Sequence, residues 1–148
     1  METALLDTNV LIHAINSRSP FQPAAGELVG RGLREWGKYC ISPQNLVEFA
    51  AVVTRPRLVE NPLSPAQAAQ MTRKLYGSRR LRKIYPKRGT VIRTIREGAS
   101  LGIKGPLWYD LYLAVTMADA GVRRIITENV DDFKGFPFIT VISIKEAV

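Results

Sequence analysis

Short apolar segments alternate with longer amphipathic segments along the whole chain, and this alternation restricts the fold more than any other sequence feature. The apolar segments have strand length and lie at Thr3–Asp7, Tyr39–Ser42, Leu81–Tyr85, Arg124–Thr127 and Phe138–Ile142. Strands that alternate with helices predict an α/β fold in which helices cover both faces of a mostly parallel sheet. We therefore expect a three-layer sandwich around a sheet of about five strands.

The segments between the expected strands carry helix start and stop signals. Thr8 or Asn9 is expected to cap the first helix, and Ser64 begins a sequence typical of a capping box with Gln67. Helices are expected at Thr8–Ile15, Ala24–Lys38, Pro43–Thr54, Pro65–Gly77, Thr90–Leu101 and Leu107–Ala120. No internal repeat or long linker divides the chain, so we expect a single domain over residues 1–148.

The composition excludes several classes of protein. With Cys40 as the single cysteine and His13 as the single histidine, neither a disulfide framework nor a Cys/His zinc site is expected. No apolar run approaches the roughly 20 residues of a membrane helix. The first residues contain no basic region of a secretory signal, so the sequence predicts a reduced, cytoplasmic protein.

Positive charge is concentrated in one part of the chain. The formal net charge is +8, yet ten of the 21 Lys and Arg residues lie between Asn61 and Arg96, a segment without any acidic residue. A solvated helical face is one interpretation, but such faces usually mix charges of both signs. Because like charges repel until an anion neutralises them, this basic block predicts contact with a nucleic-acid backbone.

Three acidic residues stand in apolar surroundings. Asp7 follows the first expected strand, Glu48 interrupts an apolar helical run, and Asp110 shares a helical stripe with apolar side chains. A structural ion pair or a helix cap is one explanation for each. Since all three are expected at one edge of a parallel sheet, a shared divalent cation such as Mg²⁺ is the other. Asp119, on the opposite side of its helix from Asp110, is expected to face solvent.

Four segments together resemble the motifs of PIN-domain ribonucleases, in the order and spacing of that family, and they span nearly the whole chain. At this length the resemblance is greatest to VapC-type toxins of prokaryotic toxin–antitoxin pairs. The four segments are Leu5-Leu6-Asp7-Thr8-Asn9-Val10-Leu11-Ile12, Ser42-Pro43-Gln44-Asn45-Leu46-Val47-Glu48-Phe49 running on to Thr54-Arg55-Pro56, Trp108-Tyr109-Asp110-Leu111-Tyr112-Leu113-Ala114, and Thr127-Glu128-Asn129-Val130-Asp131-Asp132-Phe133.

The resemblance implies an endoribonuclease that depends on Mg²⁺ or Mn²⁺. Matched position by position, Asp7, Glu48 and Asp110 are implied to be the catalytic and metal-binding acids. The fourth position of the family is often Asp and is Asn129 here, so Asn129 and Asp132 are further candidate ligands.

The resemblance also extends beyond the acids. Thr8, Asn9 and Thr127 are expected to hydrogen-bond around them. The sequence departs from the family at Tyr109, where His is frequent, and at Leu111, where Ala is common. Family likeness further implies a homodimer and a small antitoxin protein that blocks the acidic cleft.

Two other functions explain parts of the sequence. A noncatalytic nucleic-acid-binding module would use the basic block, with Tyr76 and Tyr85 stacking on bases, but would leave the three acids unexplained. A phosphatase or receiver-like α/β domain with Asp7 as nucleophile is disfavoured, because the haloacid-dehalogenase signature requires a second Asp where this chain has Asn9. Under the nuclease and binding interpretations alike, the residues expected to contact RNA are Arg73, Lys74, Arg79, Arg80, Arg82 and Lys83.

Overall fold

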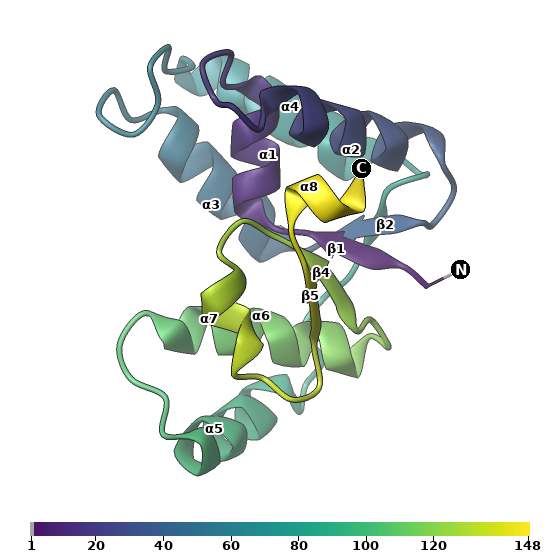
Figure 1. The fold of residues 1–148 in the computed structure, drawn as a ribbon, viewed down its shortest axis with the longest axis vertical. Coiled ribbons are helices and arrows are strands. Elements are labelled where there is room, and N and C mark those ends of the chain that lie inside the picture. The colour runs from purple at the N-terminus through teal and green to yellow at the C-terminus, as the bar shows by residue number, and fades with distance from the viewer. Residues whose placement is uncertain (1) are drawn as a thin grey trace.

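The computed structural model describes residues 2–148 and contains a five-stranded sheet in which every pair of neighbouring strands is parallel. The strands are ordered β3-β2-β1-β4-β5, with β1 in the centre (Figure 1). The expectation of a mostly parallel, about five-stranded sheet is therefore confirmed. The strands are β1 (Ala4–Leu6), β2 (Tyr39–Ile41), β3 (Arg82–Lys83), β4 (Arg124–Ile126) and β5 (Thr140–Ile142).

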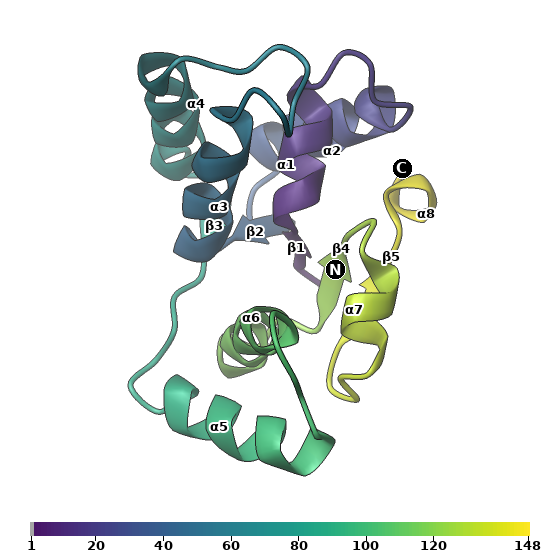
Figure 2. The ribbon, with the colours of Figure 1, turned by 90° about the vertical axis from the view of Figure 1, so that its left-hand side faces the viewer.

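Helices cover both faces of the sheet and complete the three-layer sandwich (Figure 2). One face is covered by α1 (Thr8–Ile15), α2 (Gln22–Arg34), α3 (Pro43–Val53) and α4 (Pro65–Gly77). The other is covered by α6 (Leu107–Asp119), with α5 (Thr90–Leu101) outside it and α7 (Val130–Lys134) at one side, while α8 (Ile144–Ala147) contacts α2. Within residues 2–148, no helix is both long and apolar enough to cross a membrane.

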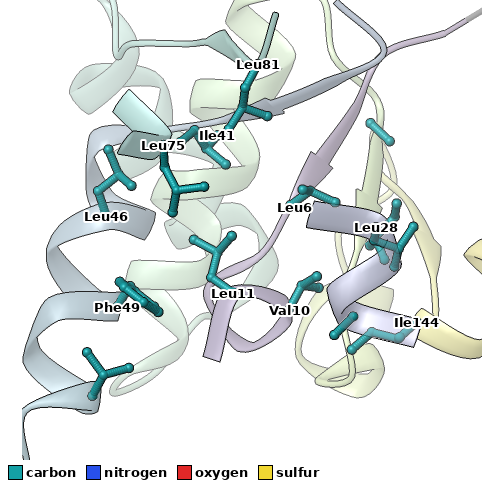
Figure 3. Packing of buried hydrophobic residues seen from close by; sticks show 14 of the residues in the cluster. Leu6, Val10, Leu11, Leu28, Ile41, Leu46, Phe49, Leu75, Leu81 and Ile144 are labelled. Carbon is teal, nitrogen blue, oxygen red and sulfur yellow. The ribbon is translucent and has the colours of Figure 1, made fainter. Parts of the chain in front are cut away.

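The two-residue period of the strands divides the buried side chains between two cores. On β1, Leu6 packs with α1 to α4 whereas Leu5 packs with α6, and Ile126 and Ile125 divide in the same way on β4. Figure 3 shows the first of these cores around Leu11. Burying such a side chain contributes about 1.5–3 kcal/mol to the stability of the fold, so both cores hold helices against the sheet.

Several element boundaries differ from the sequence prediction. Asp7, not Thr8 or Asn9, caps α1 by accepting a hydrogen bond from the Thr8 amide. The helix expected at Ala24–Lys38 begins earlier, with a proline in its first turn, and ends at Arg34 before Gly37, whose φ of 63° leads the chain into β2.

Other elements either match the sequence prediction in part or were not predicted. Only two residues of the expected strand at Leu81–Tyr85 are assigned to β3. The capping box of Ser64 and Gln67 is present in α4. The short helices α7 and α8 were not expected, because four or five residues are too few for a helical period to show in the sequence.

Helices α5 and α6 pack closely because of one glycine. A Cβ atom at Gly98 would lie 2.2 Å from the ring of Trp108, so no larger residue fits there without displacing the ring. This contact fixes α5 on the outer side of α6.

Candidate active site

The candidate site lies at the carboxyl edge of the sheet, around the end of the central strand β1. Leu6 pairs with Ile126 in the last register position of β1 and β4, and the next residues of the two chain segments, Asp7 and Thr127, meet through their side chains. The Asp7 amide donates to the Ile126 carbonyl at 3.1 Å, which fixes the backbone there. In open parallel sheets this edge, where the strand order changes direction, is the usual position of a binding site.

Asp7 is buried, with 6% of its surface exposed, and both of its carboxylate oxygens accept hydrogen bonds. The Thr8 amide donates to Oδ1 at 2.8 Å. The Thr127 hydroxyl donates to Oδ2 at 2.8 Å, and the Asn9 side-chain amide donates to the same oxygen at 3.2 Å. The three residues expected to hydrogen-bond around the acids, Thr8, Asn9 and Thr127, therefore all lie at the site.

Asn9 and Thr127 join α1 to the loop after β4. The Asn9 side chain donates to the Thr127 hydroxyl at 2.8 Å and accepts from the Glu128 amide at 3.1 Å. The Thr127 hydroxyl also accepts from the Asn129 amide at 3.0 Å. These contacts hold Asp7 against residues more than 100 positions later in the chain.

Glu48 reaches the same network from α3. The Thr8 hydroxyl donates to Glu48 Oε2 at 2.9 Å, and Gln44, one turn earlier on α3, donates to Oε1 at 3.0 Å. Asn45 is fully buried and donates to the Thr8 hydroxyl at 3.1 Å, which leaves the hydroxyl proton for Glu48. Asp7 and Glu48 are thus tied together through Thr8.

Gln44 and Asn45 were not predicted as site residues. Asn45 forms a capping box with Ser42 at the start of α3, so its sequence position is fully explained by a helix cap. Its complete burial and its second contact with Thr8 become visible only in the structure. In the sequence, one sign of their role is visible: Gln44 and Asn45 are polar and lie one helical turn before Glu48, the acid within an apolar helical run.

Asp110 approaches from the first turn of α6 and differs from Asp7 and Glu48. No hydrogen bond to its carboxylate is formed by any residue in the range 2–148. Partial burial raises its pKa to about 7, and the charges of Asp132, Asp7 and Glu48 add to this effect in that order. Asp110 therefore faces three other carboxylates without a compensating donor.

The same mutual repulsion acts on Asp7. Burial raises its pKa to about 6 even though Thr127 and the Thr8 amide lower it, and the charges of Glu48 and Asp132 contribute to the increase. No Lys, Arg or His in the described part of the chain forms an ion pair with any of these four acids. The site is consequently a carboxylate cluster that lacks positive charge.

Asp132, from the first turn of α7, adds a fourth carboxylate near the cluster, whereas Asn129 carries no charge. Asp132 is solvent-exposed but close enough to raise the pKa of both Asp7 and Asp110. Asn129 contributes its backbone amide to Thr127, while its exposed side chain forms no hydrogen bond with residues 2–148. Asp131 has 96% of its side chain exposed and lies 3.7 Å from the Lys134 ammonium.

The donor atoms of the cluster fit a hard divalent cation. Within residues 2–148, no three Asp, Glu, His or Cys side chains form a group that could hold a metal ion. Mg²⁺ does not require one, since it usually binds one or two carboxylates and completes its shell with water and phosphate oxygens. Burial is the main cause of the two raised pKa values, and a cation would offset the repulsion that adds to it.

A comparison with known families identifies this arrangement. A model of the PIN domain matches residues 4–139, a range that contains Asp7, Glu48, Asp110 and Asp132. The chain belongs to the PIN domain family.

Relatives of this PIN domain agree with that assignment. It is 27% identical over 135 residues to Ribonuclease VapC48 of Mycobacterium tuberculosis, covering 91% of this chain and 92% of VapC48. VapBC-1 from nontypeable Haemophilus influenzae has the same fold, with a TM-score of 0.66, 16% identity and coverage of 97% and 98%. DNA-bound VapBC from Salmonella typhimurium matches with a TM-score of 0.65, 22% identity and coverage of 97% and 99%.

The basic block is divided in this PIN domain between structural and unpaired cations. The Arg82 guanidinium donates to the Ala120 carbonyl at 3.0 Å, and the Lys83 ammonium donates to the carbonyls of Ser78 and Leu81. Arg80 lies over the Trp36 ring, 5.8 Å from its centroid. By contrast, Arg73, Lys74 and Arg79 are exposed and form no ion pair or side-chain hydrogen bond within residues 2–148.

Asp119 departs from its expected position. It does not simply face solvent, because the Arg93 guanidinium and the Thr90 hydroxyl of α5 donate to it at 2.8 and 2.7 Å. One cation of the basic block, Arg93, is therefore neutralised by the protein itself.

Proposed function

We propose that this PIN domain is an endoribonuclease that depends on Mg²⁺ or Mn²⁺ and acts as the toxin of a toxin–antitoxin pair. One observation carries the proposal: Asp7, Glu48, Asp110 and Asp132 share the carboxyl edge of the sheet without a cationic partner among residues 2–148. Without a cation, the repulsion among these carboxylates destabilises the folded protein. With a bound divalent cation, the same carboxylates can support hydrolysis of a phosphodiester. Distant homology to a ribonuclease supports RNA as the substrate.

In this proposal Asp7, Glu48 and Asp110 hold the cation, directly or through water, and Asp132 supplies the fourth charge in place of Asn129. A bound divalent cation lowers the pKa of a coordinated water and stabilises negative charge on a phosphate. The protein residues provide orientation: Thr127 and Asn9 fix one oxygen of Asp7, and the Thr8 amide fixes the other.

Glu48 and Asp110 have different tasks. Both oxygens of Glu48 accept hydrogen bonds, from Thr8 and Gln44, so this carboxylate has a fixed orientation from which it positions the attacking water. Asp110 accepts no hydrogen bond from the described residues, so both of its oxygens remain available for the cation and its water.

The proposal includes a protein partner. The chain's fold is shared with solved structures described as a toxin–antitoxin complex from Klebsiella pneumoniae and as VapBC complexes. We infer a small antitoxin that covers the carboxylate cluster, and a homodimer as the assembly of the toxin itself. Co-expression with candidate antitoxins, followed by co-purification, tests the partner separately from the chemistry.

Metal-dependent cleavage tests the chemistry. Structured RNAs are incubated with the wild-type protein, Asp7→Asn or Asp119→Asn, in Mg²⁺, Mn²⁺ or EDTA. We expect cleavage by wild type and Asp119→Asn with either metal, and none by Asp7→Asn or in EDTA. Equal cleavage by wild type and Asp7→Asn would refute the assignment. RNA binding without cleavage or Asp7-dependent metal binding would instead indicate a noncatalytic binding module.

A further inference from the structure

Two tyrosines meet at the outer end of the sheet, next to the edge strand β3. Tyr76 lies near the end of α4 and Tyr85 lies two residues beyond β3. Their hydroxyl groups are 2.8 Å apart and hydrogen-bond to each other. Each residue nevertheless keeps 48% of its surface exposed, so neither ring is part of a core.

The strand register places this tyrosine pair on the same edge as the carboxylate cluster. Ile41 pairs with Lys83, and the Ile84 amide donates to the Ile41 carbonyl at 2.9 Å, so Ile84 stands level with Ser42. The pairing of β1 with β2 likewise places Asp7 level with Ser42. Tyr85 follows Ile84, roughly two strand spacings or about 10 Å along the sheet from the β1 end. A few nucleotides of an extended strand span that distance.

The surroundings of the pair carry unpaired positive charge. Arg73 lies one helical turn before Tyr76 on α4, is exposed, lines the same surface groove, and forms no ion pair or side-chain hydrogen bond within residues 2–148. Lys83, bound to the carbonyls of Ser78 and Leu81, holds the loop between α4 and β3 in place. Exposed aromatic rings beside unpaired cations are the combination that binds single-stranded nucleic acid, because bases stack on the rings while cations contact phosphates.

We propose that Tyr76 and Tyr85 form a base-binding site, where an unpaired base of the RNA stacks on their exposed rings. The inference rests on the proposed function for its ligand, a single-stranded RNA segment. It assigns the pair a positioning role: the bound base fixes which phosphate reaches the carboxylate cluster. The hydrogen bond between the hydroxyls keeps the two rings in a constant relative position.

A second copy of the chain is the competing occupant of this surface. An apolar groove of about 710 Å³ between α3 and α4 has Tyr76, Val47 and Ala50 among its lining residues. A copy docked there would cover Tyr76. The exposed cation Arg73 in this groove favours a polyanion on this surface over a second copy that would bring its own Arg73.

Photocrosslinking tests the site without relying on cleavage. Wild-type protein is irradiated in EDTA with single-stranded oligonucleotides of RNA that carry 5-iodouridine, and the crosslinked peptides are identified by mass spectrometry. We expect crosslinks at Tyr76 or Tyr85. Trp36 is the matched control, because it is 69% exposed and lies against Arg80 but precedes β2, at the opposite edge of the sheet. Crosslinks that favour Trp36, or none at either tyrosine, would overturn the proposal.

Substitutions separate stacking from a structural role. Tyr76→Ala and Tyr85→Ala are each expected to weaken RNA binding in EDTA about tenfold, whereas Tyr76→Phe and Tyr85→Phe retain it, since stacking needs the ring and not the hydroxyl. Phe variants as defective as the Ala variants would show that the hydrogen bond matters and not the ring. Urea unfolding confirms that each variant is folded.

Two further readouts distinguish the possible failures. Crosslinks at the tyrosines without any Mn²⁺-dependent cleavage would support the base site and refute the nuclease. Cleavage by wild type that is unaltered in rate and position in both Ala variants would refute the base site and retain the nuclease. A change of molecular mass in Tyr76→Ala by light scattering would assign the surface to a second copy, and the base site would then be rejected.

Discussion

Two aspartates at opposite ends of α6 have opposite environments. Asp119, in the last turn, is bound by Arg93 and Thr90 of α5. Burial alone would raise its pKa, but these two donors bring it below its ordinary value. Asp110, in the first turn, has no donor among the described residues. Partial burial raises its pKa to about 7, and the charges of Asp132, Asp7 and Glu48 add to this effect. One helix thus carries a carboxylate whose charge is compensated by hydrogen bonds and another whose charge is not.

The two environments show that Asp119 serves the structure, and they support the proposed functional role of Asp110. The pair of Asp119 and Arg93 joins α5 to the last turn of α6, whereas the close contact of Gly98 with Trp108 joins α5 to its first turn. Asp110 forms no comparable contact between elements, and its repulsion by the neighbouring carboxylates destabilises the fold. Unfavourable groups of this kind persist at functional sites, where a ligand supplies the missing interaction.

The largest expected difference between the two aspartates is in RNA cleavage. Asp110→Asn should lower the cleavage rate at least about a hundredfold, because even losing a residue that only supports a metal ligand costs roughly 10–100-fold. Asp119→Asn should cleave at the wild-type rate. Single-turnover cleavage in Mn²⁺ measures both, and equal loss of rate in the two variants would remove the functional distinction.

The next effect is on stability, in the opposite direction. Asp119→Asn should lower the free energy of unfolding by about 1–2 kcal/mol, since it replaces a charged hydrogen-bond acceptor whose partner Arg93 is partly exposed. Urea denaturation in EDTA gives this value. If Asp119→Asn were as stable as wild type, the hydrogen bonds of Asp119 would not contribute to the stability of the fold.

A smaller effect of opposite sign is expected for Asp110. In EDTA at pH 8, Asp110→Asn should raise the free energy of unfolding by about 1 kcal/mol, because it removes one of four repelling carboxylates. Asp131→Asn is the matched control: Asp131 lies on α7 beside Asp132, but 96% of its side chain is exposed. Stabilisation in the control alone would contradict a local repulsion at the cluster.

The two aspartates also differ in how far their environments could be predicted from the sequence. Asp110, Asp7 and Glu48 stand out because each interrupts an apolar pattern, and that isolation is local. The partner of Asp119 was not foreseen, since Arg93 lies 26 residues away on another helix and its contact depends on how α5 packs. Long-range pairs of this kind arise from packing and leave no periodic signal.

The supporting residues of the site follow the same rule. Strand alternation predicted the sheet and the edge where the acids meet, and Thr8, Asn9 and Thr127 were expected from their positions beside the acids. Asn45 was missed because a helix cap already explains it. Asp132, which adds its charge to the cluster, lies on the short helix α7, whose orientation the sequence does not encode in any repeating pattern.

The smallest expected effect is a pH dependence specific to Asp119. Because its pKa in the folded protein lies below the unfolded value of 3.8, the carboxylate stabilises the fold above that pH, and the contribution is lost as the pH falls through the folded value. The difference in unfolding free energy between wild type and Asp119→Asn should therefore be constant from pH 7 to about pH 5 and shrink below about pH 4. Urea titrations over this range measure it. A difference that instead grew on acidification would mean that Asp119 is held in its protonated form, and the contrast with Asp110 would then disappear.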